Sequence, residues 1–281
     1  ESDAFAAVLD LYRAAEGLDW TMLAPSPMEA WPAMPTPAWP SGATRRGGGD
    51  EVPGAHPVDR DALVVLAHGT ASDAGTATVE RLVADAGRRL PGVEVRLGYV
   101  DVRAPDPARA LAGTVDPVVV PLFLLAGYHV RTDVPDAVAA HGSGTVTEHL
   151  GAAPEVITAL AGRLAGAGAP QAPVVLATAG SSDPRARAEV EVVARALADR
   201  TSREVAVGVL SGDGPAVADV AGGLARPESP VLLAHLLAPG HFHRRLEAVG
   251  AGLDLPVTAP VLPSDAVADL VVRRYREALG D

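Results

Sequence analysis

The chain has 281 residues, of which 48% are hydrophobic and only 4% aromatic, so we expect one large domain or two of ordinary size with a core of Ala, Val and Leu. Its formal net charge of −12 argues against a nucleic-acid partner, and it has no apolar run of the about 20 residues that a membrane span needs. The absence of cysteine excludes disulfides, thiolate metal sites and cysteine nucleophiles, and the absence of lysine excludes Schiff-base chemistry and a P-loop.

The N-terminal segment differs in composition from the rest of the chain. Residues 3–16 carry apolar side chains at helical spacing and predict a helix. Residues 24–58 are rich in proline and glycine, which indicates a linker or an extended arm. The first residues are acidic and amphipathic rather than basic and then apolar, so we expect no signal peptide and a cytoplasmic protein. We therefore assign 1–58 to an N-terminal helix and a Pro/Gly/Trp-rich arm.

From residue 61 onward, apolar runs of strand length alternate with segments of helical periodicity. This alternation is typical of a parallel, doubly wound α/β sheet. The predicted strands are 63–67, 93–100, 118–125, 145–148, 204–210, 230–237 and 256–261, and the predicted helices are 74–90, 106–112, 132–140, 153–166 and 264–279.

An internal repeat divides this region. The sequence LVVLAHGTASD (63–73) recurs as PVVLATAGSSD (173–183), and FLLAGYHVRTDVPDAV (123–138) recurs more loosely as HLLAPGHFHRRLEAV (235–249). The repeat predicts two similar α/β lobes, 61–168 and 172–281, with a ligand-binding cleft between them.

Two histidines follow predicted strands of the first lobe. His68 comes just after 63–67 and His129 just after 118–125, each near a glycine, Gly69 or Gly127, that permits a tight turn. Ligands of open α/β sheets bind at the carboxyl ends of the strands, so we expect both imidazoles at the same rim. Imidazole binds Fe, Co, Ni or Zn and accepts protons near neutral pH, although an isolated rim histidine is more often structural.

The repeat does not preserve this pair. The second lobe has Ala179 or Thr178 in place of His68, and His129 is matched only loosely by His241-Phe242-His243. We therefore place the histidine pair in the first lobe alone. The second lobe is expected to supply a wall, in which Arg244 and Arg245 are candidate carboxylate partners. The remaining histidines are interpreted as incidental: His56, His141, His149 and His235.

Polar residues precede a helix in both halves of the repeat. They are Thr70, Ser72 and Asp73 in the first half and Ser181, Ser182 and Asp183 in the second. Side chains of this type cap helices. Free N–H groups at such a helix start can also bind a substrate carboxylate, and the sequence leaves both roles open.

These residues together resemble the sirohydrochlorin chelatases, a family that inserts a divalent metal into a tetrapyrrole. The likeness covers about 61–280 and rests on VVLAHGT, VPLFLLAGYHVRTDVP and LGAAPEVITALAGRL, with VVLATAGSSDP and LLAPGHFHRRL in the second half. The layout is similar to the long, internally duplicated bacterial form, which is class II chelatase-like. LGAAP departs from the more usual Leu-Gly-Pro-Asp-Pro, His241 stands where an aromatic residue is more common, and the arm at 1–58 has no counterpart.

The resemblance implies that His68 and His129 act as metal ligand and proton acceptor while Fe²⁺ or Co²⁺ replaces two pyrrole protons of sirohydrochlorin, for sirohaem or cobalamin biosynthesis. The metal is then a substrate, and we expect no permanently bound cofactor. Because sirohydrochlorin carries eight carboxylates, contacts with the macrocycle are expected from Gly69, Thr70, Tyr128, Arg131, Ser181 and His243.

Two alternatives stay open at this point. One is a non-catalytic carrier of metal or tetrapyrrole, and the other is a chelatase-like enzyme for another tetrapyrrole or metal such as Ni²⁺. In each case we expect a tetrapyrrole and a metal ion as partners, neither nucleic acid nor membrane, and a monomer or a homodimer.

Overall fold

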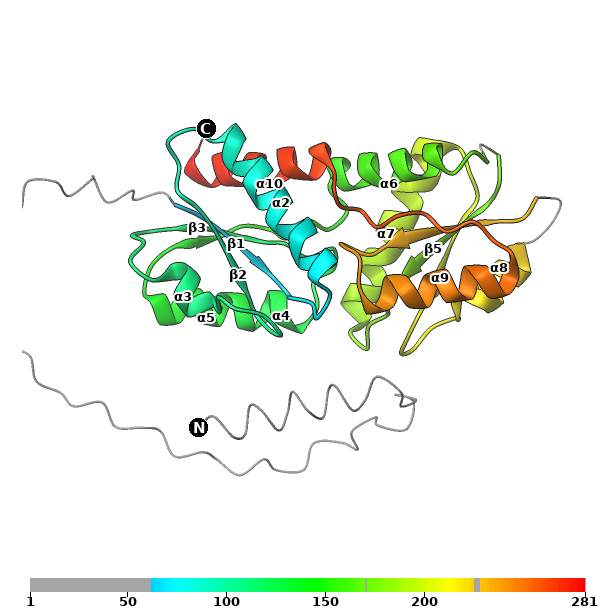
Figure 1. Ribbon diagram of the computed structural model, residues 1–281, viewed down its shortest axis with the longest axis horizontal. Coiled ribbons are helices and arrows are strands. Elements are labelled where there is room, and N and C mark those ends of the chain that lie inside the picture. Colours follow the sequence, from blue (N-terminus) through cyan, green and yellow to red (C-terminus); the bar gives the residue numbers. More distant parts are fainter. Residues whose placement is uncertain (1–61, 170, 225–227, 281) are drawn as a thin grey trace, which may run out of the picture. The chain divides into compact units, whose positions relative to one another are not determined.

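The computed structural model describes residues 62–169, 171–224 and 228–280, which form two parallel β-sheets flanked by helices (Figure 1). The predicted helix at 3–16 and the arm that follows it lie outside the described residues. None of the described helices is long and apolar enough to cross a membrane.

The first sheet has the strand order β2-β1-β3-β4 and the second has the order β6-β5-β7, with parallel pairing throughout. The strands are β1 (Leu63–Ala67), β2 (Val95–Tyr99), β3 (Val118–Pro121), β4 (Thr145–Val146), β5 (Val174–Thr178), β6 (Val205–Val209) and β7 (Val231–His235). The helices are α2 (Asp73–Arg89), α3 (Pro107–Leu111), α4 (Tyr128–Arg131), α5 (Asp133–His141), α6 (Pro154–Gly166), α7 (Pro184–Thr201), α8 (Val217–Leu224), α9 (His241–Leu253) and α10 (Asp265–Leu279).

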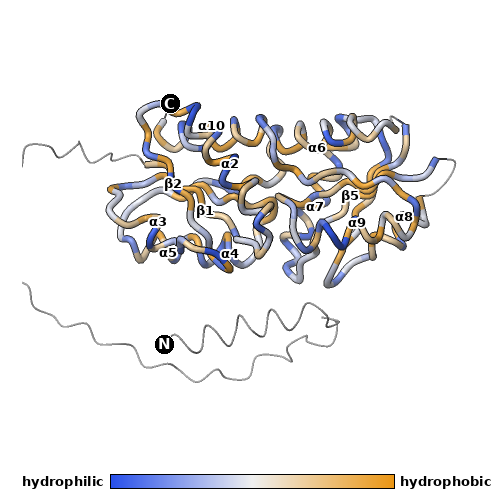
Figure 2. Tube along the Cα trace, in the orientation of Figure 1, coloured by the Kyte–Doolittle hydropathy of each residue, from blue (hydrophilic) through white to orange (hydrophobic). Residues whose placement is uncertain are grey.

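The central strands are buried on both faces, which explains their continuous apolar sequences. In β1, Leu63 and Val65 face a core that continues into the second lobe, whereas Val64 and Leu66 face a separate core under α3 and α5. In β5, Leu176 belongs to the shared core and Val175 to a third core under α8 and α9. Figure 2 shows hydrophobic colour concentrated along the strands and hydrophilic colour mostly on surrounding helices and loops.

The two lobes exchange a helix. Helix α6 follows the first sheet in sequence but packs against α7 and β7 of the second, and α10 follows the second sheet but packs against α2 and β3 of the first. Arg273 of α10 joins the exchanged helices through a bidentate contact with Glu155 of α6, at 2.7 and 3.0 Å. The shared core and this exchange tie the lobes together on one side of both sheets.

The predicted fold class, two α/β lobes with parallel sheets, is confirmed. The sequence placed the last helix with the second lobe, and its packing on the first lobe is a difference that local patterns do not encode. The predicted strand at 256–261 is wrong, because this segment makes only one isolated bridge, Leu232 to Val257. The strand predicted at 118–125 is shorter and ends at Pro121. The lobe boundaries and the cleft stay predictions.

Candidate functional site

The loop that carries His68 leaves the carboxyl end of β1 and is held in a tight turn. Gly69 has φ +98°, and a Cβ there would lie 2.1 Å from the carbonyl oxygen of Asp101, so no other residue fits without a shift. Arg103 braces the loop by donating to the carbonyl oxygens of Thr70 (2.7 Å) and Ala71 (3.0 Å). The His68 side chain is thereby left exposed at the rim of the sheet.

His129 reaches the same rim from β3. The chain passes beyond Pro121 and enters the four-residue helix α4 at Gly127, so His129 lies in the first turn of a short helix rather than in the turn that the sequence suggested. Its Nδ1 lies 2.5 Å from Oδ2 of Asp133, one helical turn further on. The rings of His68 and His129 meet edge to face, with centroids 4.6 Å apart and an interplanar angle of 86°.

The hydrogen bonds of the two rings determine which nitrogens are available. Nδ1 of His68 lies 3.1 Å from the carbonyl oxygen of Gly69, and Nδ1 of His129 is taken by Asp133. Within the described part of the chain, neither Nε2 atom makes a hydrogen bond. A carboxylate that fixes one ring nitrogen leaves the other as the basic lone pair, which is the arrangement found around metal-binding histidines.

Two aromatic side chains surround His129. Tyr128 is 67% exposed, and its ring meets the His129 ring edge to face at a centroid distance of 5.9 Å. The Phe123 ring stacks on the His129 ring at a centroid distance of 6.3 Å. An exposed tyrosine beside the histidine pair offers an apolar face to a flat ligand. Its predicted contact with the substrate stays a prediction.

Arg131 lies on the same short helix but is paired with the second lobe. Its Nη1 is 3.4 Å from Oδ2 of Asp183, which caps α7 by accepting from the Arg185 N–H at 2.8 Å. Ser181 accepts from the Asp183 N–H, and Ser72 caps α2 by accepting from the Gly75 N–H. The capping interpretation of Ser72 and Asp183 is therefore confirmed, and Arg131 has a carboxylate partner within the chain.

The second lobe carries apolar residues where the first carries histidine. Strand registers match Leu63 with Val174 and Val118 with Val231, which places Ala179 opposite His68 in the repeat and Phe242 opposite His129. His243 of α9 is hydrogen-bonded within its own lobe: its Nε2 lies 3.1 Å from the Thr258 carbonyl oxygen, and no described contact joins it to the histidine pair. Its role in substrate binding stays a prediction.

The lobes approach each other closely beside the His68 loop. A Cβ at Gly75 of α2 would lie 2.3 Å from the carbonyl oxygen of Pro239, and one at Gly240 would lie 3.3 Å from Thr70 Oγ1. Thr70 also accepts from the Ser72 N–H, at 3.2 Å. Thr70 thus lies between the histidine loop and the turn before α9, where the two lobes meet.

A group of buried and partly buried titratable residues was missed from the sequence. Nε2 of His149 lies 2.6 Å from Oε1 of Glu189 on α7, and His235 at the end of β7 is fully buried with no described hydrogen-bond partner at either ring nitrogen. Burial lowers the pKa of His235 to about 4, against which the charge of Glu189 raises it. The interpretation of His149 as incidental to the site stays a prediction, but the structure gives it a partner. That partner is distant in sequence, so no local signal indicates the pair.

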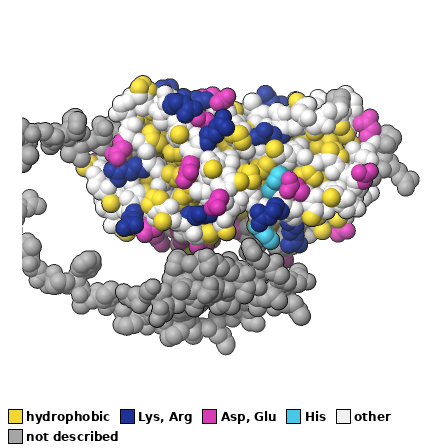
Figure 3. Space-filling model, viewed as in Figure 1, with side chains coloured by type: hydrophobic (Ala, Val, Ile, Leu, Met, Phe, Trp, Pro, Cys, Tyr) yellow, Lys and Arg dark blue, Asp and Glu magenta, His cyan; other side chains and the backbone are white. Residues whose placement is uncertain are grey.

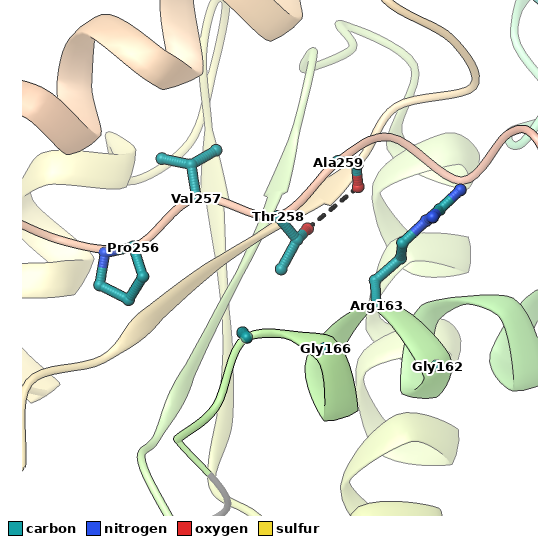
Figure 4. Close-up of a pocket in the computed structure, with 8 residues that line it drawn as sticks. Gly162, Arg163, Gly166, Pro256, Val257, Thr258 and Ala259 are labelled. Carbon is teal, nitrogen blue, oxygen red and sulfur yellow. Dashed lines mark hydrogen bonds between the residues drawn. The ribbon is translucent and has the colours of Figure 1, made fainter.

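Two cavities are lined by residues other than His68 and His129. One of about 280 Å³ is bordered by Arg163, Gly166 and the 256–259 segment, with Thr258 donating to the Ala259 carbonyl oxygen (Figure 4). A second, of about 90 Å³, is lined by Leu125 of the first lobe and by residues of the second, Ser181 among them.

Figure 3 shows arginine and carboxylate side chains interspersed over the visible face. In the described ranges no cluster of three or more His, Asp or Glu is placed to hold a metal.

The fold and the site define a class: a two-lobed parallel α/β protein with a histidine pair at the strand ends of its first lobe. Residues 62–167, which include His68 and His129, match the CbiX family model. The resemblance to the chelatases found in the sequence is thereby confirmed. None of the curated proteins compared with the chain matches it.

Several solved structures share the fold. The chain is similar to SirB from Bacillus subtilis with Fe³⁺, with 20% identity and a TM-score of 0.68, over 78% of this chain and 95% of that one. It is also similar to the sirohydrochlorin chelatase SirB from Bacillus subtilis subspecies spizizenii in complex with cobalt (19%, TM-score 0.65, 78% and 94%). DR2241 from Deinococcus radiodurans, described as structurally similar to chelatases, matches at 24% with a TM-score of 0.63, over 77% and 55%.

Proposed function

We propose that the protein is a chelatase that inserts a divalent metal, Fe²⁺ or Co²⁺, into sirohydrochlorin. The observation that carries this proposal is the His68–His129 pair, with ring centroids 4.6 Å apart and the Nδ1 of each ring already hydrogen-bonded. The CbiX match over this lobe supports it, and so does the likeness to SirB structures that contain iron or cobalt.

The chemistry follows from the two Nε2 atoms. A metal ion binds imidazole nitrogen at about 2.0–2.1 Å. Two rings this close can both bind the same ion, or one ring can bind the ion while the other accepts a proton. One histidine holds the incoming M²⁺ while the other accepts one pyrrole proton, and the second pyrrole proton passes to solvent as the metal enters. Asp133 keeps the proton of His129 on Nδ1, so its Nε2 stays a lone-pair donor. The metal is a substrate in this scheme.

The macrocycle is proposed to lie against Tyr128, with its carboxylates at Arg131 and at the loop amides of Gly69 and Thr70. Ser181 and His243 complete the proposed contacts from the second lobe. The pairing of Arg131 with Asp183 supports a carboxylate site, because the two side chains of this 3.4 Å ion pair are each 29% exposed and open to exchange with a carboxylate of the substrate.

The test is anaerobic metal insertion followed by absorbance, with the protein substoichiometric to sirohydrochlorin and Fe²⁺, Co²⁺ and Ni²⁺ compared. Multiple turnovers are expected with Fe²⁺ or Co²⁺. Binding without turnover would contradict the proposal and favour a carrier, and turnover with Ni²⁺ alone would point to a different metal specificity.

A further inference from the structure

Helix α7 of the second lobe reaches the turn that leads to His129. The Glu189 carboxylate accepts the Ala126 N–H at 2.8 Å through Oε2, and Oε1 lies 2.6 Å from His149 Nε2. The side chains of His149 and Glu189 are only 17% and 20% exposed. One partly buried carboxylate thus connects α7 to two separate segments of the first lobe.

Ala126 lies where a contact can hold helix α4, which carries His129, in place. It precedes Gly127, the N-cap of α4, and lies three residues before His129. Helix α4 has four residues and no side-chain cap, so its own hydrogen bonds contribute little to its placement. The turn before it, in which the Gly127 N–H donates to the Leu125 carbonyl oxygen at 3.0 Å, therefore governs where His129 lies.

The carboxylate is itself held firmly. Gly151 has φ +53°, and a Cβ there would lie 2.9 Å from Glu189 Oε1, so this position leaves room for the pair with His149. Burial raises the pKa of Glu189, but the hydrogen bonds from His149 and the Ala126 amide, together with the charges of His149 and His235, lower it overall. Glu189 is consequently ionised at neutral pH and is a strong acceptor for the amide.

We propose that Glu189 is a positioning residue of the second lobe, which fixes His129 against His68 by holding the Ala126 amide, with His149 orienting its carboxylate. This inference rests on the proposed function, to which it adds a contribution of the second lobe to the histidine pair. Misplacement of a reacting group by about 1 Å can cost a hundredfold in rate, so loss of this contact acts on catalysis rather than on substrate binding.

The test compares Glu189→Ala, Glu189→Gln and Glu155→Ala in the full chain. For Glu189→Ala we expect kcat for metal insertion to fall about tenfold, with KM for sirohydrochlorin nearly unchanged. Glu189→Gln keeps an acceptor for the Ala126 amide and should recover most of kcat. Glu155→Ala removes a comparable carboxylate, hydrogen-bonded to Arg273, without touching the first lobe's rim, and should leave kcat unchanged. A wild-type kcat in Glu189→Ala, or an equal loss in Glu155→Ala, would overturn the inference.

A readout that needs no activity separates this inference from the proposed function. Amide hydrogen exchange at Ala126, followed by NMR, should become at least about tenfold faster in Glu189→Ala and stay unchanged in Glu155→Ala. The imidazole resonances of His129 should also shift in Glu189→Ala only. If the wild type inserts no metal but these changes occur, the proposed function fails and the positioning role stands. If the wild type is active and Ala126 exchange is unaffected, the positioning role fails alone.

Discussion

The loop after β1 and the loop after β5 have the same backbone course but different side chains. Gly69 has φ +98° and packs on the Asp101 carbonyl, and Gly180 has φ +101° and packs on the Ser211 carbonyl. The preceding residue is His68 in one lobe and Ala179 in the other. The fold thus fixes a place for a side chain at each strand end, and of the two loops only the one in the first lobe has an imidazole there.

The ends of β3 and β7, the equivalent strands of the two lobes, show the reverse difference, with a histidine in the second lobe only. Registers of β3 and β7 match Leu122 with His235, so the second lobe has a buried imidazole where the first has a core leucine. His129, in turn, is matched by Phe242. The comparison teaches that a duplicated frame can keep its backbone while its two copies carry different side chains at equivalent strand ends.

The largest expected effect comes from breaking the pair at His129. His129→Ala should lower kcat for metal insertion by about a hundredfold or more, because it removes a metal ligand or a proton acceptor. The matched change in the second lobe, Phe242→Ala, should cost stability through the α9 core but leave kcat within a few fold. Initial rates and thermal unfolding of both variants check this, and equal losses of activity would mean that the lobes share the chemistry.

His235 provides a pH test of the second lobe. Its pKa is lowered to about 4 by burial, so the unfolded chain binds a proton near pH 6.5 that the folded chain does not. Through His235, the free energy of unfolding should therefore fall by roughly 3 kcal/mol as pH drops from about 6.5 to about 4, and no further below that. His235→Leu, which copies Leu122, should remove this contribution. Urea unfolding at several pH values measures the free energy of unfolding of both proteins. If it depends on pH between about 4 and 6.5 equally in His235→Leu and in the wild type, the prediction is contradicted.

Asp133 tests how the second nitrogen of His129 is controlled. Asp133→Ala should weaken Co²⁺ binding to the apo protein about tenfold, because the ring loses its fixed tautomer and orientation. Asp133→Asn retains an oxygen acceptor and should lose less. Titration followed by visible absorption measures both affinities, and equal affinity in the alanine variant would show that Asp133 plays no part in metal binding.

The smallest effect is expected at Arg131. Arg131→Leu should raise KM for sirohydrochlorin several fold with little change in kcat, because it removes binding made equally in the ground and transition states. A macrocycle with esterified carboxylates should show no difference between the variant and the wild type. If Arg131→Leu raises KM for the esterified macrocycle as much as for sirohydrochlorin, the guanidinium does not contact a carboxylate.

Much of this arrangement could be predicted from local patterns. Apolar runs at 63–67 and 174–178 identify strands buried on both faces, and the strand ends place His68 and His129 on one rim. The contact between Glu189 and His149 could not be predicted, since it joins residues forty positions apart in different lobes. The packing of α10 on the first lobe is equally invisible, because its apolar stripe fits either sheet. Pro256 and Pro260 explain the missing strand at 256–261, because proline lacks the N–H that a ladder needs.

The central claim is that His68 and His129 act as one unit in the first lobe. A double-mutant cycle on kcat for metal insertion tests it most directly, with His68→Ala, His129→Ala and the double variant measured anaerobically at saturating metal. Residues that act together lose most of their effect when either is removed, so the double variant should be about as slow as each single variant. Losses that multiply, or single variants with wild-type rates, would contradict the account.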